Sequence, residues 1–163
     1  MADPRTELRL PVLSGRAWTF ADALGADDIL PVRFQGLPAT EAAQRLFADL
    51  DADLAAAMRP GDVLVGGRHV GGGPGGGPAA RALARAGVIA VVVGSFAPGF
   101  AEAVLAAGLP PLEVDAPAVF HTGHRIRLNL EGGIIANLSS GDRQPVRNLS
   151  EPLVERLRKL LGR

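Results

Sequence analysis

Residues 62–93 read DVLVGGRHVGGGPGGGPAARALARAGVIAVVV. Asp62–Val65 is a short apolar run typical of a strand, and the glycine-rich segment Gly66–Gly77 follows it as a loop. Pro78–Ala86 has the character of a short helix with proline in its first turn, where the missing N–H costs nothing. A glycine ends this helix as a left-handed cap, and Val88–Val93 is continuously apolar, as parallel strands covered on both faces are. The segment predicts a strand–helix–strand unit with a right-handed crossover.

The residues before this unit predict two short extended segments and a helix. Leu8–Leu13 is apolar and reads as a first strand, while Asp27–Val32 reads as a second, with Pro31 at a strand end or edge. A helix is expected to begin at Thr40, its N-cap. Its apolar face, at spacings of three and four, carries Ala43, Leu46, Phe47 and Leu50, with Leu54 and Met58 extending it.

The residues after the unit predict a helix, a hairpin and a final helix. Phe96–Ala107 is the expected second helix of the core. Arg125–Leu130 alternates polar and apolar residues, Glu131–Gly133 forms a tight turn, and Ile134–Leu138 returns as the partner strand. The last helix opens at Ser150, with Leu153, Leu157, Leu160 and Leu161 on its inner face. The fold class is therefore α/β, a mixed sheet with a βαβ core and a C-terminal hairpin plus helix, in one domain over residues 1–163.

Composition narrows the possible functions. Hydrophobic residues make up 47% of the 163 residues and charged ones 21%, which is typical of a globular chain. The 17 basic and 17 acidic residues balance, so no basic excess points to nucleic acid. There is no cysteine, so this chain has no thiolate to hold zinc or an iron–sulfur cluster. The polar N-terminus and the shortness of Val88–Val93 predict no membrane span and a cytoplasmic location.

The glycine-rich loop leaves two interpretations open. Gly71, Gly73 and Gly76 formally satisfy G-x-G-x-x-G, but no acidic residue follows the next strand, and no Gly-Lys-Ser/Thr is present. A dinucleotide site is therefore weakly supported and a P-loop is excluded. Backbone N–H groups at the start of the Pro78 helix can cradle an anion. The alternative is a flexible surface loop with no ligand.

The titratable residues form no obvious catalytic set. His69 enters the glycine loop beside a strand end, which gives it the best functional case of the three histidines. His121 and His124 match no helical metal-binding spacing and read as solvated turn residues. Asp27 and Asp28 are either paired carboxylates for acid–base chemistry or solvated turn residues. The simplest interpretation of Arg125 and Arg127 is that they lie on the solvent-exposed face of the hairpin.

Several short motifs, spread over nearly the whole chain, recur in the same order in one family. They are Gly15–Phe20, Asp27–Phe34, Pro60–Gly67, Ala86–Val91, Ser95–Ala97, Gly108–Leu112, Leu130–Gly133 and Asn137-Leu138. With these motifs the chain resembles the small subunit of 3-isopropylmalate dehydratase (isopropylmalate isomerase), the swivel domain of the aconitase superfamily.

This resemblance implies a swivelling β/β/α domain of the aconitase type. It implies a large-subunit partner that holds a 4Fe–4S cluster through its own cysteines, with no cofactor on this chain. The implied reaction is dehydration and rehydration of a hydroxy di- or tricarboxylic acid. The small subunit would close over the cluster and bring polar groups to this carboxylate substrate.

The chain departs from the family at its reactive loop. The family's loop reads Gly-x-Gly-Ser-Ser-Arg-Glu-His and carries a serine base and a substrate-binding arginine. Here Pro74 and Gly76 stand at the matching serine and arginine positions, and the family's Asp-Thr-Asp is reduced to Gly25-Ala26-Asp27. No catalytic residue is assigned. The predicted substrate-binding residues are Asp27, Arg33, His69, Gly71, Gly73, Gly75, Gly76 and Gly77.

Two functions follow from this departure. In the first, the chain is a diverged small subunit that still works with a large subunit, and glycine N–H groups bind a carboxylate in place of the lost arginine. In the second, the domain has lost catalysis and serves as a binding or scaffolding module.

Overall fold

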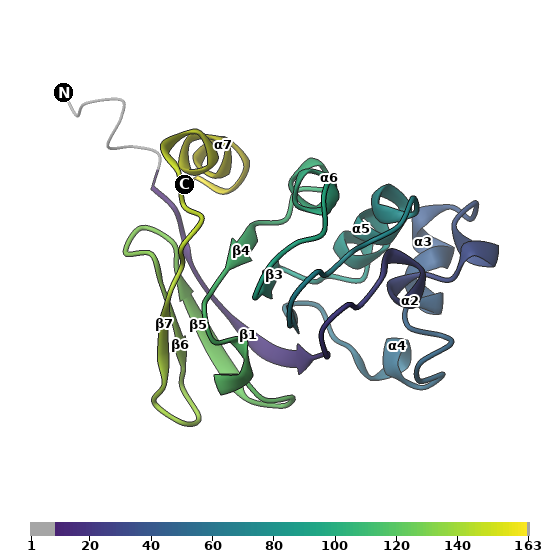
Figure 1. The fold of residues 1–163 in the computed structure, drawn as a ribbon, viewed down its shortest axis with the longest axis horizontal. Coiled ribbons are helices and arrows are strands. Elements are labelled where there is room, and N and C mark those ends of the chain that lie inside the picture. The colour runs from purple at the N-terminus through teal and green to yellow at the C-terminus, as the bar shows by residue number, and fades with distance from the viewer. Residues whose placement is uncertain (1–8, 163) are drawn as a thin grey trace.

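A computed structural model describes residues 9–162, and its centre is a curled seven-stranded mixed sheet (Figure 1). The strand order is β4-β3-β2-β1-β5-β6-β7. Four strands run parallel, and three further strands extend the sheet antiparallel from β1. The parallel strands are β1 (Val12–Thr19), β2 (Val63–Gly66), β3 (Ala90–Val93) and β4 (Pro111–Glu113), and the antiparallel ones are β5 (Arg125–Asn129), β6 (Ile134–Asn137) and β7 (Arg143–Pro145).

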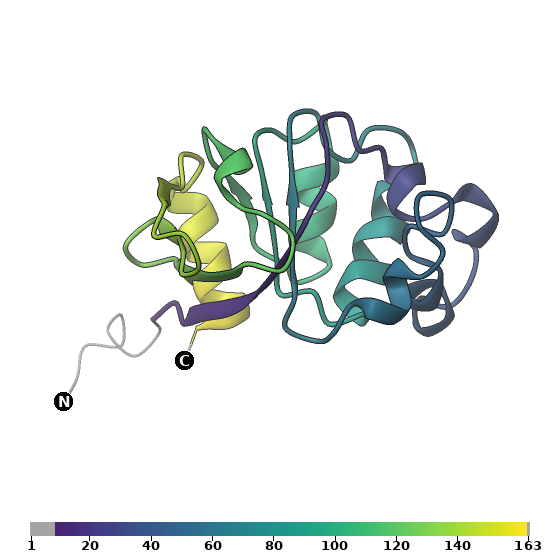
Figure 2. The ribbon, with the colours of Figure 1, turned by 90° about the horizontal axis from the view of Figure 1, so that it is seen from below.

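Helices cover the two faces of this sheet separately (Figures 1 and 2). One hydrophobic cluster joins the sheet to α5 (Gly76–Arg85), α6 (Phe100–Ala106) and the short helices of residues 26–57. A second cluster joins the opposite face to α7 (Glu151–Leu161), whose Leu157 is completely buried. Those short helices are α2 (Ala26–Ile29), η1 (Val32–Phe34), α3 (Ala39–Ala42), η2 (Ala43–Arg45) and α4 (Leu54–Ala57), and a further turn of helix is η3 (Pro117–Val119).

The predicted α/β class, βαβ core and hairpin are confirmed. Strand β2, helix α5 and strand β3 follow one another, with the two strands paired in parallel. Gly87 has a φ of +92°, so it is the left-handed residue expected after this helix. Strands β5 and β6 pair antiparallel. Ser150 caps α7 by accepting a hydrogen bond from the Leu153 N–H. On α7, however, Leu160 is half-exposed, so it does not belong to the buried face of the helix as predicted.

Three predicted elements differ from the structure, all in the first third of the described chain. Residues 27–32, predicted as extended, form most of α2 and the start of η1. The Asp28 carboxylate accepts the Gly25 N–H at 2.8 Å, and this local bond stabilises the first turn of α2. Strand β1 lies later than predicted, and Leu8 lies outside the described residues.

The single helix predicted from Thr40 to Met58 is broken into α3, η2 and α4. The break is at Phe47, whose φ of +58° is left-handed. Its N–H donates to the Ile29 carbonyl at 2.8 Å, and its fully buried ring stacks on Phe20 with ring centroids 4.5 Å apart. Burial of a whole aromatic ring outweighs the cost of one left-handed residue, which is about 1–2 kcal/mol. Leu50 is consequently exposed.

Candidate functional site

The candidate site lies at the carboxyl ends of the parallel strands. Strand β2 ends at Gly66 and β3 at Val93, and the glycine-rich loop leaves the sheet between them. In open sheets of this kind ligands bind outside the carboxyl ends of the strands. The segment that follows β1, which includes α2, lies against the same loop through three backbone hydrogen bonds. One runs from the Ala23 N–H to the Arg68 carbonyl at 2.7 Å, and the other two involve Gly71 and Gly72.

Those two bonds clamp the first half of the loop. The Gly71 N–H donates to the Leu24 carbonyl at 2.7 Å, and the Ala26 N–H donates to the Gly72 carbonyl at 2.8 Å. Gly71 has a φ of +92°, and a Cβ built on it would overlap the Phe100 ring. Glycine is required here by both the backbone conformation and the close approach of the aromatic ring. The role of Gly71 in the structure is therefore to seat the loop on α6.

The second half of the loop forms the start of α5. Gly75 is the N-cap residue, and Gly76 and Gly77 make the first turn. Within residues 9–162, no hydrogen-bond acceptor meets the N–H groups of these three glycines. Open N–H groups at the start of a helix of 10 residues point the positive end of its dipole at any ligand there. This arrangement favours an anion such as a carboxylate.

Asp27 is brought to this helix start through a residue that the sequence did not single out. The Gln35 side-chain amide donates to the Asp27 carboxylate at 3.1 Å and to the Leu30 carbonyl at 3.0 Å. The same amide lies directly over Gly75, so that a Cβ at Gly75 would overlap it. Gln35 thus connects Asp27 to the start of α5. No sequence motif marks Gln35, and only the fold places it here.

Arg33 points to a different partner. Its guanidinium forms two hydrogen bonds to the Asp49 carboxylate, at 2.9 and 2.7 Å, and lies over the Phe34 ring at 4.4 Å. The hydrogen bond between the two side chains lowers the pKa of Asp49 and raises the pKa of Arg33. Both side chains are more than half exposed. A role for Arg33 in substrate binding stays a prediction and requires this ion pair to open.

His69 enters the loop as expected, and its backbone is unusual. Its φ is +55°, and its N–H donates to the Ser95 hydroxyl at 2.9 Å. The residue is exposed. His124, by contrast, is tied to the hairpin, because its Nδ1 lies 2.9 Å from the Asn137 side-chain nitrogen. A left-handed, exposed His69 is available to a ligand, whereas His124 has a structural partner.

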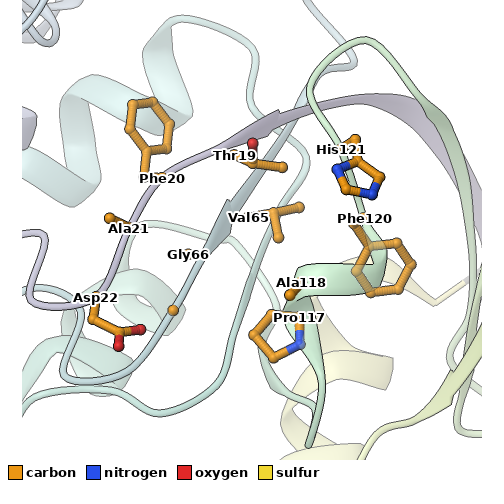
Figure 3. A pocket seen from close by; sticks show the side chains of 11 residues that line it. Thr19, Phe20, Ala21, Asp22, Val65, Gly66, Pro117, Ala118, Phe120 and His121 are labelled. Atoms are coloured by element: carbon orange, nitrogen blue, oxygen red, sulfur yellow. The ribbon is translucent and has the colours of Figure 1, made fainter.

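A hollow of about 360 Å³ lies beside the start of the glycine loop (Figure 3). The segment after β1, the end of β2 and the turn that contains η3 line it. Figure 3 shows the Asp22 carboxylate and the His121 ring on opposite sides of this hollow. Asp22 accepts the Arg68 N–H at 2.8 Å and so fixes the first turn of the loop. None of the predicted substrate-binding residues lines the hollow, and sequence reasoning gave no role to Asp22.

The chain's donors do not fit an iron–sulfur cluster. Clusters of this kind are held mainly by thiolates, and the sequence has no cysteine. Across residues 9–162, no group of three or more histidine or acidic side chains is placed to hold a metal ion. No chemical step is therefore assigned to a metal on this chain.

The described residues also contain no helix that is long and apolar enough to cross a bilayer.

Comparison with known proteins identifies the family. No family model matches the chain. The 3-isopropylmalate dehydratase small subunit of Nautilia profundicola is 35% identical over 131 residues, which cover 80% of this chain and 79% of that protein. The chain belongs to the 3-isopropylmalate dehydratase small-subunit family. The resemblance predicted from the sequence is thus confirmed.

Other relatives in this family carry different names. The isopropylmalate/citramalate isomerase small subunit of Methanocaldococcus jannaschii is 32% identical over 146 residues, 88% of this chain and 87% of that protein. The homoaconitase small subunit of Thermus thermophilus is 36% identical over 126 residues, 74% of this chain and 76% of its own length.

Comparison with a solved structure confirms the predicted fold of this chain. The crystal structure of 3-isopropylmalate dehydratase from Methanocaldococcus jannaschii superposes with a TM-score of 0.79. It covers 89% of both chains at 23% sequence identity. The curled mixed sheet is therefore the fold of that dehydratase chain, as the resemblance led us to expect.

Proposed function

We propose that this chain is a diverged small subunit that joins a cluster-bearing, aconitase-type large subunit to act on a hydroxy di- or tricarboxylic acid. The observation that carries the proposal is identity of 32–36% to small subunits named for isopropylmalate, citramalate and homoaconitate chemistry. Such an assembly is cytoplasmic in this proposal, and it involves neither nucleic acid nor a membrane.

The reaction places clear demands on the site. Elimination of water requires removal of a weakly acidic proton beside a carboxylate, so a base and stabilisation of negative charge are needed. A 4Fe–4S cluster on the partner would supply Lewis-acid activation of the hydroxyl. In this proposal the present chain binds and orients a substrate carboxylate at the N–H groups of Gly76 and Gly77, which are partly exposed, whereas Gly75 is buried beneath Gln35. The Gln35 amide, held by Asp27, faces the same place.

The loop sets the expected strength of this binding. Pro74 and Gly76 stand where the family has serine and arginine, so the loop offers no hydroxyl base and no guanidinium. Charge-assisted bidentate bonds are the strong ones, and backbone N–H groups replace them only in part. We therefore expect weak carboxylate binding and a proton-transfer group at a position other than 74 and 76. The exposed His69, near the start of the same loop, is one candidate on this chain.

The second candidate function is a catalytically inactive swivel domain that serves as a binding module. The replacement of both reactive loop residues favours it. The two functions differ in whether a complex of this chain turns over a substrate, and only the first function requires a large-subunit partner.

The test is co-expression of this chain with an aconitase-type large subunit, followed by anaerobic purification and cluster reconstitution. Isopropylmalate, citramalate and homoaconitate are then assayed with the purified complex and with each subunit alone. Turnover by the complex and by neither subunit alone supports the enzyme. A stable complex with no turnover of any of the three supports the binding module. Failure to form any complex with the large subunit contradicts the enzyme function.

A further inference from the structure

The outer face of the antiparallel strands carries two adjacent rows of side chains. Strand pairing places Val12, Asn129, Ile134 and Pro145 in one row across β1, β5, β6 and β7. The next row is Ser14, Arg127, Ala136 and Arg143. Arg125 follows two residues before Arg127 on the same side of β5. We call this surface, defined by Val12, Arg125, Arg127, Ile134, Ala136 and Arg143, the basic face.

The basic face is open, in contrast to the reverse side of the same strands. On the reverse side Ile126, Leu128 and Ile135 are fully buried in the cluster that contains α7. On the basic face Val12 is 59% exposed, and the three arginines are all exposed. The strands form one end of the molecule (Figure 1).

The three arginines have no acidic partner within residues 9–162. Elsewhere in this part of the chain, some arginines are in ion pairs, such as Arg33 and Arg147, and others, such as Arg81 and Arg85, are not. What distinguishes the basic face is therefore that three exposed arginines without an acidic partner gather on one surface. Arg16 stands opposite Arg125 in the register, but it turns away to Asp62 at 3.2 Å. The positive charges of Arg125, Arg127 and Arg143 therefore face solvent together, and at low salt they attract a negatively charged partner.

The two arginines of the second row flank a groove. Arg127 and Arg143 stand on either side of Ala136, whose small side chain forms the floor. The groove has a volume of about 400 Å³, and Leu138, 46% exposed, lines it too. Arginine together with exposed aliphatic side chains, without lysine or carboxylates, is the composition that protein interfaces favour.

The extent of the basic face favours a polypeptide partner. The Cα atoms of Arg125 and Arg127 are about 7 Å apart along a strand, and those of Arg127 and Arg143 are about 10 Å apart across two strands. A segment with several Asp or Glu residues can engage all three arginines at once. The apolar row beside the arginines gives such a segment a hydrophobic contact as well.

We propose that the basic face docks an acidic segment of the large subunit. This inference rests on the proposed function, because it assumes that the large subunit binds. The antiparallel strands lie on the other side of β1 from β2 and β3, where the glycine loop begins. Docking there anchors the subunit and leaves the loop free to face a substrate.

The test is binding of the full-length chain to the purified large subunit by calorimetry at several salt concentrations. The double variant Arg127→Glu/Arg143→Glu is compared with Arg85→Glu/Lys159→Glu, which makes the same charge change at exposed positions on α5 and α7. We expect at least a tenfold loss of affinity, and a weaker salt dependence, for the first variant alone. Circular dichroism checks that both variants fold.

The outcomes separate the two proposals. If the large subunit binds the wild type and both double variants with equal affinity, the docking role of the basic face is wrong and the proposed function is unaffected. No binding by the wild type overturns the proposed function and this inference with it. Sedimentation of the wild-type chain alone tests whether a second copy of this chain occupies the basic face instead. Self-association that is lost in Arg127→Glu/Arg143→Glu would assign the face to a second copy and overturn the large-subunit proposal.

Discussion

The Gly71 N–H donates to the Leu24 carbonyl at 2.7 Å, so the glycine loop is bound to the segment that leads into α2. These two residues belong to segments that follow different parallel strands, β2 and β1. The bond holds Asp27 and the start of α5 on one side of the sheet. The loop is therefore a seated element in its first half and an open helix start in its second half.

Replacement of Gly71 by alanine tests the seated half. In Gly71→Ala an alanine is forced into the left-handed backbone conformation, and its methyl group overlaps the Phe100 ring. The two effects together should lower the unfolding free energy by about 2–5 kcal/mol. Gly73→Ala is the matched control, because Gly73 has a φ of +100° but no atom within 4 Å of its Cβ position. It should cost about 1–2 kcal/mol. Urea unfolding measures both, and equal losses would show that Phe100 does not seat the loop.

Asp62 is a buried carboxylate that ties strand β1 to β2. It accepts the Trp18 indole N–H at 2.6 Å, the Arg59 N–H at 2.8 Å and the Arg16 guanidinium at 3.2 Å. Each buried donor left unpaired costs about 1–3 kcal/mol, so Asp62→Ala should lose roughly 2–4 kcal/mol of unfolding free energy. Trp18, the single tryptophan, should change its fluorescence in the folded state. Asp49→Ala, which breaks the exposed pair with Arg33, should lose much less.

The stability of the chain should depend on pH through Glu131. A hydrogen bond from the Leu10 N–H at 2.9 Å, with Arg158 nearby, holds the pKa of Glu131 below its ordinary value of 4.5. A carboxyl group whose folded pKa is lowered stabilises the fold in full above its unfolded pKa. That contribution is lost as the pH falls through the folded pKa.

The variant Glu131→Gln keeps an acceptor for Leu10 and removes the charge. It should therefore be less stable than the wild type at neutral pH, and the difference should shrink below about pH 4. Urea midpoints between pH 3 and pH 7 measure this convergence. Parallel curves across that range would show that Glu131 does not contribute.

Local patterns predicted those parts of the fold that local physics governs. The apolar run of β3, the left-handed Gly87 and the polar–apolar alternation of β5 can each be predicted from residues that are close in sequence. The break at Phe47 depends on the Ile29 carbonyl and the Phe20 ring, which are distant in sequence. Helical periodicity from Thr40 to Met58 was therefore misleading, because a tertiary contact outweighed it.

The candidate site shows the same division. The glycine loop and Asp27 were found from motifs, and the structure brings them together. Gln35, which connects them, and Asp22, which holds the first turn of the loop, carry no motif. Arg33 was proposed from its place in a motif, yet its guanidinium is bound to Asp49. Side-chain partners across loops are set by the fold, so sequence spacing alone does not predict them.

Restoration of the family's loop residues tests the assignment of the reactive loop. The double variant Pro74→Ser/Gly76→Arg, in complex with a large subunit, should turn over isopropylmalate at least ten times faster than the wild-type complex, since it gains a base and a guanidinium. A Cβ at Gly76 lies 3.3 Å from the Phe100 ring, so a small adjustment is needed. Gly77→Ser is the control, because it adds a hydroxyl one residue beyond these positions. An equal rate for wild type and double variant would place the missing chemistry elsewhere.

The open half of the loop should respond to carboxylates in the free subunit. The Gly76 and Gly77 N–H groups have no acceptor within residues 9–162, whereas the Gly71 N–H is bound to Leu24. Citrate or malate should therefore shift the amide NMR signals of Gly76 and Gly77 and leave that of Gly71 unchanged. The helix dipole contributes only about 0.3–1 kcal/mol, so we expect saturation at millimolar concentrations or above. Sodium chloride at matched ionic strength is the control. If all three glycine signals stay fixed, or chloride moves them equally, the start of α5 does not bind carboxylates and the substrate-binding role of these glycines is wrong.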